Sequence, residues 1–344
     1  MADVQSLIRK NVRNLKPYSS ARDEFKGTAS VWLDANENPN NNGLNRYPDP
    51  LQKKLKERIS KLKSVPTKNI FLGNGSDEAI DLLFRGFCEP GKDKALICSP
   101  TYGMYQVSAD INDVEVIDVP LTSDWQLNTK SIQKHFAEPN LKLIFICSPN
   151  NPTGNSMNKE DVLALVSAFN GLVIIDEAYI DFSEVTSLST ELEKYNNLVI
   201  LQTLSKAWGL AGIRLGMAFA NTEIIDVLNR IKPPYNINQL TQEVALKELA
   251  YEEKFQVEAD AIILERKRLK NELQPLKNVL GIYPSDANFL LVRFANPKEI
   301  YAVLSSKGIV VRDRSNVVEG CLRITVGTEK ENALLIKGLK KLEP

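Results

Sequence analysis

Short apolar runs alternate with longer segments of mixed polarity between about residues 50 and 220 of the 344-residue chain. The apolar runs are typical of buried strands because they are short and rich in β-branched side chains. The segments between them repeat apolar positions at helical spacing, most clearly over residues 51–63, 77–87 and 159–169. This alternation predicts an α/β fold, in which helices cover both faces of a mostly parallel sheet. The expected strands are IFLGN, ALICS, VEVIDV, LKLIFICS, LVIID, LVILQ and GMAFA.

The pattern changes after Pro233-Pro234. A long charged helix is expected over residues 243–273, with too few apolar positions for full burial. The segments ANFLLVRF, IVVRD and LRITV, together with two further helices, predict a smaller α+β domain. We therefore expect an N-terminal arm (1–30) that joins the small domain, a large domain (31–240) and a small C-terminal domain (241–344).

A turn-prone stretch follows the strand-like segment VWLDA, near the end of the arm. Its sequence, NENPNNNGLNRYPDP, is rich in Asn, Pro and Gly and predicts a long loop over residues 36–50. Composition alone favours a flexible surface connector for this loop.

Composition and charge argue against several classes of function. The net charge is zero at 43 basic and 43 acidic residues, so no overall field favours nucleic acid or an acidic membrane. No apolar run approaches the ~20 residues of a membrane span, and the first residues lack a signal-peptide core. The four cysteines form no CxxC pair, which argues against a metal site or a disulfide framework and leads us to expect a cytoplasmic protein. His135 is the only histidine, which argues against histidine triads and zinc chemistry.

The most informative segment is TLSKAWGLAGIRLG, which contains Ser205, Lys206 and Arg214. Asp176 ends the apolar run LVIID thirty residues before the lysine. Pyridoxal 5′-phosphate (PLP) needs a lysine amine for a Schiff base and a carboxylate that keeps the pyridine nitrogen protonated. A serine and an arginine near small residues can hold the cofactor phosphate.

Other candidate groups follow the expected strands, and each has an ordinary structural explanation. In GNGSDE, the backbone amides of Ser76 can bind phosphate, or Ser76 can simply cap the next helix. Tyr102 of SPTYGMY can stack on a cofactor ring or only pack in its loop. Asn151 of SPNNPTG and Tyr179 of DEAY can reach a ring oxygen of the cofactor. Asp176 of DEAY can pair with the pyridine nitrogen or simply cap the next helix. Together they lie after strands whose carboxyl ends form the ligand-binding edge of open α/β sheets.

The same motifs, with LDANENP, RYPDP, SDANF, VRDRS and LRITVGT, closely resemble the histidinol-phosphate aminotransferase family. The resemblance covers residues 14–341 and implies a PLP-dependent transferase of fold type I, in the class II aminotransferase group. It implies that the large domain binds PLP and that the chain forms a homodimer with shared active sites. The implied reaction, in histidine biosynthesis, interconverts L-histidinol phosphate and 2-oxoglutarate with imidazole acetol phosphate and L-glutamate.

The resemblance also implies roles for individual residues. Lys206 would bond the cofactor and move protons, Asp176 would bond the pyridine nitrogen, and Asn151 and Tyr179 would bond the ring oxygen, with Tyr102 stacked on the ring. The cofactor phosphate would be held by Gly75, Ser76, Asp77, Ser205 and Arg214, and by Tyr47 of a neighbouring subunit. The substrate would be bound by Arg323, with Arg312 and Tyr18 as helpers and Asn36 and Glu37 at the border of the cleft.

Three other functions share parts of this pattern. A PLP lyase such as a threonine-phosphate decarboxylase uses most of the same motifs but releases CO₂. An aminotransferase for aromatic amino acids would differ only in its substrate. A non-catalytic protein with a PLP-type fold is disfavoured because Lys206, Asp176 and Arg214 are intact and no basic helix-turn-helix segment is present.

Overall fold

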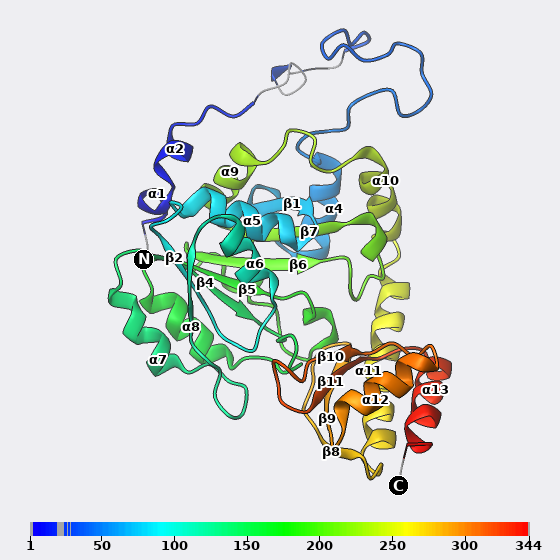
Figure 1. The fold of residues 1–344 in the computed structure, drawn as a ribbon. Coiled ribbons are helices and arrows are strands. Elements are labelled where there is room, and N and C mark those ends of the chain that lie inside the picture. Colours follow the sequence, from blue (N-terminus) through cyan, green and yellow to red (C-terminus); the bar gives the residue numbers. More distant parts are fainter. Residues whose placement is uncertain (1–2, 19–23, 26, 28, 343–344) are drawn as a thin grey trace.

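The computed structural model describes residues 3–18, 24–25, 27 and 29–342. The strands of its large sheet are β1 (Ile70–Asn74), β2 (Lys94–Ile97), β3 (Glu115–Asp118), β4 (Leu141–Cys147), β5 (Leu172–Asp176), β6 (Leu198–Thr203) and β7 (Leu215–Ala220). Their order across the sheet is β1-β7-β6-β5-β4-β2-β3 (Figure 1). Strand β7 runs antiparallel to both its neighbours, and the remaining pairs are parallel. The predicted α/β fold with a mostly parallel sheet is confirmed.

Helices cover both faces of this sheet and bury two separate apolar cores. One face carries α4 (Lys53–Lys63), α7 (Thr129–Gln133), α8 (Lys159–Ala168) and α10 (Gln239–Glu248). The other face carries α5 (Ser76–Phe87), α6 (Met104–Ile111) and α9 (Thr222–Ile231). In β6, Leu198 and Ile200 pack into the first core, and Val199 and Leu201 pack into the second. Strand side chains alternate between the faces, so the consecutive apolar residues 198–201 of β6 supply both cores.

Short 3₁₀ helices lie in several connections of the large domain. They are η1 (Thr67–Asn69), η2 (Lys134–Ala137), η3 (Ile180–Phe182), η4 (Leu188–Glu191) and η5 (Ala211–Ile213).

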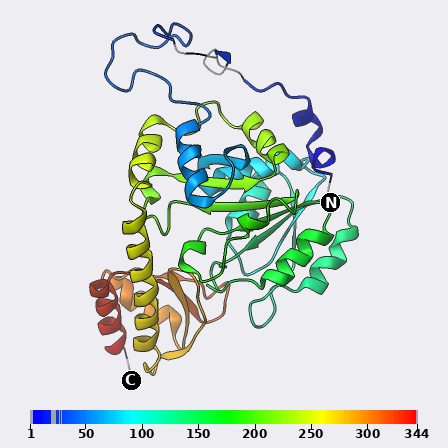
Figure 2. The same ribbon diagram turned by 180° about the vertical axis from the view of Figure 1, so that it is seen from behind.

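The small domain is built on a second, four-stranded antiparallel sheet with the order β10-β11-β9-β8. Its elements are β8 (Val279–Ile282), β9 (Phe289–Phe294), α12 (Pro297–Ser306), β10 (Arg312–Asp313), β11 (Cys321–Thr325) and α13 (Glu329–Lys340). Helix α11 (Glu252–Leu273) runs from the large domain down to this sheet and packs against α13 (Figures 1 and 2). The predicted α+β character of the C-terminal segment is confirmed.

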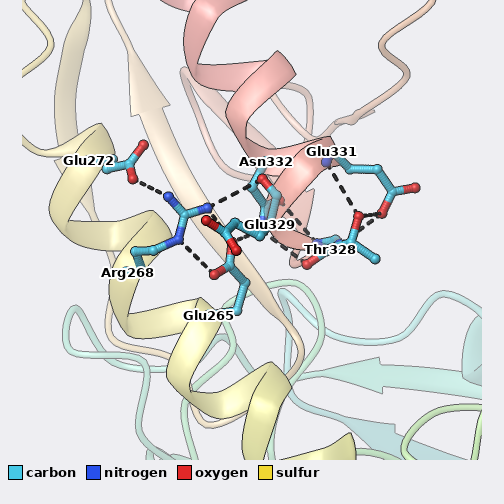
Figure 3. Close-up of polar contacts among 8 residues, drawn as sticks. Glu265, Arg268, Glu272, Thr328, Glu329, Glu331 and Asn332 are labelled. Atoms are coloured by element: carbon cyan, nitrogen blue, oxygen red, sulfur yellow. Dashed lines mark hydrogen bonds and ion pairs between the residues drawn. The ribbon is translucent and has the colours of Figure 1, made fainter.

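A polar network joins α11 to the start of α13 (Figure 3). Arg268 donates to both oxygens of Glu265 at 2.5 and 2.7 Å and also bonds Glu272. Asn332 donates to Glu265 at 2.7 Å. Thr328 and Glu331 form a reciprocal capping box at the N-terminus of α13. These contacts attach the N-terminus of α13, and with it the small domain, to the C-terminal half of α11.

The single helix expected over residues 243–273 is wrong, because the structure divides it into α10 and α11. Arg58 of α4 donates to the carbonyl oxygen of Leu249 through Nε at 3.1 Å and through a second nitrogen. Since that carbonyl lies at the C-cap of α10, the bond satisfies an acceptor that a continuous helix would use itself. Helix α10 packs on α4, so we propose that the boundary between the domains lies near Tyr251 rather than at residue 240.

The described start of the chain packs on the large domain, not on the small domain as expected. Its short helices are α1 (Val4–Leu7) and α2 (Lys10–Arg13). Val4, Leu7 and Val12 are buried in the same apolar core as residues of α5 and α9, and α1 packs against α9. Arg230 of α9 also donates to the carbonyls of Val12 and Arg13 at 3.2 Å.

Residues 36–50 form the predicted long loop, which extends away from the large domain (Figure 1). VWLDA is not a strand: Val31 and Leu33 are 67% and 89% exposed, and among the described residues no strand pairs with it. All four cysteines are buried, as expected of small apolar residues. No helix in the described part of the chain is both long and apolar enough to cross a membrane.

Candidate active site

The predicted chemical motifs meet in one cavity of about 420 Å³ between the carboxyl edge of the large sheet and the small domain. Its lining is Gly75, Ser76, Asp77, Tyr102, Cys147, Asn151, Asp176, Ala178, Tyr179, Thr203, Ser205, Lys206, Arg214, Arg312, Arg314 and Arg323. Parallel strands bring their carboxyl ends to the same edge, so motifs far apart in sequence converge here. The cavity contains all the predicted site residues except Tyr18, Asn36, Glu37 and Tyr47.

One end of the cavity is an anion site made by a helix N-terminus and an arginine. Gly75, at φ 74°, is the N-cap of α5, and no side chain caps the helix. Ser76 is therefore the first residue of α5 and not its cap, which answers the alternative left open by the sequence. Arg214 lies 3.5 Å from Ser205 Oγ and 3.6 Å from Asp77. Free helix amides beside a guanidinium favour a phosphate group.

The backbone of this anion site is held by close packing against β7. A Cβ atom on Gly216 would lie 2.1 Å from the Ser76 nitrogen and 2.2 Å from the Gly75 carbonyl carbon. A Cβ atom on Gly75 would lie 2.5 Å from an Arg214 guanidinium nitrogen. Glycine is needed at both positions because any side chain would push the Ser76 amide or Arg214 out of place.

Asp176 is a buried carboxylate at the end of β5. Tyr105 donates to its Oδ2 at 2.8 Å, and the Ala178 backbone N–H donates to its Oδ1 at 3.1 Å. Burial raises the pKa of Asp176 to about 6, although these two hydrogen bonds oppose the rise. No salt bridge to Asp176 is formed by the residues that the structure describes. A cation beside this carboxylate, such as a protonated pyridine nitrogen, would therefore be strongly stabilised.

Lys206 lines the cavity beside Tyr179. Its Nζ lies 5.6 Å from the centroid of the Tyr179 ring. Burial and the positive charge of Arg323 lower the pKa of the Lys206 amine, against the opposing charge of Asp176. A lowered pKa raises the fraction of free amine, which is the form that acts as a nucleophile or a base.

Aromatic and amide groups surround the space between Lys206 and the anion site. The Tyr102 hydroxyl donates to Asp77 at 3.1 Å, and its ring lies edge-on to Tyr105. Asn151 donates to the Tyr179 hydroxyl at 3.4 Å and accepts a hydrogen bond from Arg323 at 2.5 Å. Burial raises the pKa of both Tyr102 and Tyr179, so both hydroxyls stay protonated near neutral pH.

Missed in the sequence were Thr203 and Arg314, which line the cavity, and Tyr105, which contacts Asp176. Arg314 lines the cavity, two positions after Arg312, and the alternation of side chains along an extended strand is the signal that could have found it. Tyr105 contacts Asp176, and its place one helical turn after Tyr102 is a weaker signal.

Four predicted residues lie outside the cavity within one chain. Tyr18 is 70% exposed. Asn36, Glu37 and Tyr47 line a separate pocket under the long loop. Glu37 accepts a hydrogen bond from the Tyr47 backbone N–H at 2.6 Å, and the Tyr47 ring stacks on Tyr235 with centroids 4.4 Å apart. Their expected roles therefore require the loop of another subunit, or a different position of the N-terminal arm.

Comparison with known proteins agrees with this geometry. The family model described as aminotransferase class I and II matches residues 14–339. A histidinol-phosphate aminotransferase of Parabacteroides distasonis is 55% identical over 345 residues, covering 100% of each chain. This chain belongs to the histidinol-phosphate aminotransferase family.

Solved structures extend the comparison to the fold. A histidinol-phosphate aminotransferase of Clostridium acetobutylicum matches with a TM-score of 0.81 and 27% identity, over 87% of this chain and 91% of that one. The enzyme of Sinorhizobium meliloti in complex with pyridoxal 5′-phosphate matches with a TM-score of 0.78 and 22% identity, over 86% and 83%. The predicted fold of PLP-dependent transferases of type I is confirmed.

Proposed function

We propose that this protein is a PLP-dependent histidinol-phosphate aminotransferase that acts in histidine biosynthesis. It would interconvert L-histidinol phosphate and 2-oxoglutarate with imidazole acetol phosphate and L-glutamate. The observation that carries the proposal is the meeting of Lys206, buried Asp176 and the anion site of α5 in one cavity. The 55% identity to the histidinol-phosphate aminotransferase of Parabacteroides distasonis, over the full length of both chains, supports the choice of reaction.

The groups of the cavity fit the cofactor. The amides of Ser76 and Asp77, the Ser205 hydroxyl and Arg214 would hold its phosphate, with Gly75 leaving room for the turn. The buried Asp176 carboxylate would bond its pyridine nitrogen.

Tyr102 would stack on the cofactor ring. Asn151 and Tyr179, which are already hydrogen-bonded to each other, would contact the ring oxygen. When bound, PLP withdraws electrons from the substrate Cα and so makes its proton removable.

Lys206 would carry the proton transfers. Its lowered pKa favours the free amine, which can accept a proton from the substrate Cα and would deliver it to C4′ of the cofactor. Asp176 assists without moving a proton, because its negative charge stabilises a positive pyridine nitrogen.

Arg323, with Arg312 beside it, would bind the acidic end of the substrate. In the antiparallel pairing of β10 and β11, Arg312 lies opposite Arg323. A guanidinium binds carboxylate and phosphate equally well in its two-pronged geometry, which suits an enzyme that must accept both glutamate and a phosphate ester.

We propose further that the active enzyme is a homodimer. The exposed loop carries Tyr47, Asn36 and Glu37 away from the cavity of its own chain, so these residues can serve a second copy. A mixture of Lys206→Ala and Tyr47→Ala subunits should then be more active than either variant alone, because one of its two sites would be intact. Equal inactivity of the mixture would argue against shared sites.

The cytoplasmic location stays a prediction.

The reaction is tested by a single turnover of the PLP-loaded protein with L-histidinol phosphate and no keto acid. Loss of the visible absorbance band, its return on adding 2-oxoglutarate, and formation of glutamate are expected. An unchanged band would reject this substrate, and aromatic amino acids would be tried next. Release of CO₂ from phosphothreonine would instead identify a decarboxylase.

A further inference from the structure

Arg314 forms a third arginine on the small-domain wall of the cavity, beside Arg312 and Arg323. Arg314 directly follows β10, and both Arg312 and Arg314 line the cavity, whereas Asp313 between them does not. The main chain of Arg314 is fixed, since its N–H donates to Cys321 O at 3.0 Å and its carbonyl accepts from Val318 N at 2.8 Å. The main chain that carries this guanidinium is therefore held by the end of β10, the start of β11 and the turn between them.

The charge of Arg314 is not neutralised within the described part of the chain. The neighbouring Asp313 accepts hydrogen bonds from the Ser315 backbone N–H, at 2.8 Å, and from the Ser315 hydroxyl. Its carboxylate is thus held in the local turn. The buried Nε of Arg314 has no hydrogen-bond partner, and no ion pair to Arg314 is formed among residues 3–18, 24–25, 27 and 29–342.

The two acidic side chains of the cavity belong to the opposite wall. Asp77 faces Arg214 at 3.6 Å, and Asp176 is bonded by Tyr105. The small-domain wall therefore presents three guanidinium groups without an acidic partner in the cavity lining. Burial and the charges of Arg323 and Arg312 lower the pKa of the Arg314 guanidinium, which is the sign of mutual repulsion.

A ligand with more than one negative charge relieves this repulsion best. A carboxylate brings a single charge and two oxygens. A phosphate monoester carries close to two charges at neutral pH and offers three acceptor oxygens. Two arginines are enough for the bidentate contacts of a carboxylate, so the third has a use mainly with phosphate.

We propose that Arg314 binds the phosphate of the amino donor and so sets the preference of the enzyme for a phosphate-bearing donor over glutamate. This inference rests on the proposed function, because it assigns a substrate group to the same cavity. It adds a specificity-determining residue to the pair formed by Arg312 and Arg323.

The test compares PLP-loaded wild-type protein with Arg314→Gln, Arg314→Lys and Arg293→Gln. Arg293 lies on β9, is exposed, and serves as a matched loss of charge outside the cavity. Absorbance gives kcat/KM for the half-reactions with L-histidinol phosphate and with L-glutamate. A second readout is the rise in unfolding midpoint caused by inorganic phosphate, measured on loaded protein so that the cofactor's own phosphate fills the α5 site.

In Arg314→Gln, the ratio of kcat/KM for histidinol phosphate to that for glutamate should fall about 10- to 100-fold, the value of a charge-assisted hydrogen bond. The lysine variant should fall less, and Arg293→Gln should keep the wild-type ratio. The midpoint rise with phosphate should shrink in Arg314→Gln only.

Several results would overturn the inference. If both half-reactions fall equally, or neither falls, Arg314 does not distinguish the donors. If wild-type protein does not react with histidinol phosphate, the proposed function fails, and the midpoint shift alone then decides the phosphate contact. An identical shift in wild type and Arg314→Gln would remove Arg314 from any phosphate site.

Discussion

Replacing Asp176 by asparagine is expected to stabilise the cofactor-free protein at neutral pH while impairing the loaded enzyme. In the folded protein, burial raises the pKa of this carboxyl from 3.8 to about 6. At 1.36 kcal/mol per pKa unit, the ionised carboxylate destabilises the folded state by about 3 kcal/mol. Asparagine carries no charge and can still accept from the Ala178 N–H and bond the Tyr105 hydroxyl, so most of this penalty should disappear.

The sign of the pH dependence follows from the raised pKa. The folded state binds the proton more tightly, so the stability due to the neutral Asp176 is full below pH 3.8 and is lost as pH rises through about 6. The stability difference between Asp176→Asn and wild type should therefore be about 1.5 kcal/mol at pH 5 and about 3 kcal/mol at pH 8.

The assay is urea unfolding of both cofactor-free proteins at several pH values, with Asp110→Asn as a control. Asp110 is an exposed carboxylate on α6, so its replacement should change the free energy of unfolding little at any pH. With PLP bound the order should reverse, because only the wild type gains an ion pair with the pyridine nitrogen. A difference that does not grow between pH 5 and 8, or a less stable variant at pH 8, would refute this account of the buried carboxylate.

Three other substitutions test the remaining parts of the site. Lys206→Ala should keep cofactor binding, measured by fluorescence titration, but lower kcat by orders of magnitude, and near-normal transamination would exclude the lysine as the proton carrier. Arg323→Lys should lower kcat/KM for both half-reactions about 10-fold or more, because lysine lacks the two-pronged geometry, whereas unchanged kinetics would remove Arg323 from the site. Tyr105→Phe removes a hydrogen bond that stabilises the ionised Asp176, so the pKa of Asp176 should rise further and PLP should bind about 10-fold more weakly at pH 7. Unchanged cofactor affinity across pH 5 to 8 would show that Tyr105 only fills space.

The sequence predicted those parts of the molecule that depend on local pattern. Strand β5 was expected as LVIID and spans Leu172–Asp176, because a short apolar run admits few alternatives. The convergence of Lys206, Asp176 and Ser76 follows from parallel strands, whose carboxyl ends share one edge.

The errors involve contacts between distant residues. The break before α11 accompanies a bond from Arg58 to Leu249, and no periodicity within residues 243–273 reveals that bond. The sequence did not reveal that the described start of the arm packs on the large domain, because the short apolar face of Val4 and Leu7 fits several surfaces equally well in sequence terms. Arg314 was missed because a charged residue next to a turn is more often a solvated surface residue.

The packing of Gly216 against the Ser76 amide affects how sequence variants of this enzyme should be interpreted. Position 216 lies on β7, is not part of the cavity lining and has no side chain, yet a single methyl group there would collide with the backbone of residues 75 and 76. In a saturation mutagenesis screen it should therefore tolerate substitution as poorly as Lys206 does. Intolerance to substitution at Gly216 would result from the short distance between the main chain of β7 and that of Gly75 and Ser76. Positions that do not tolerate substitution should therefore not all be interpreted as ligand contacts.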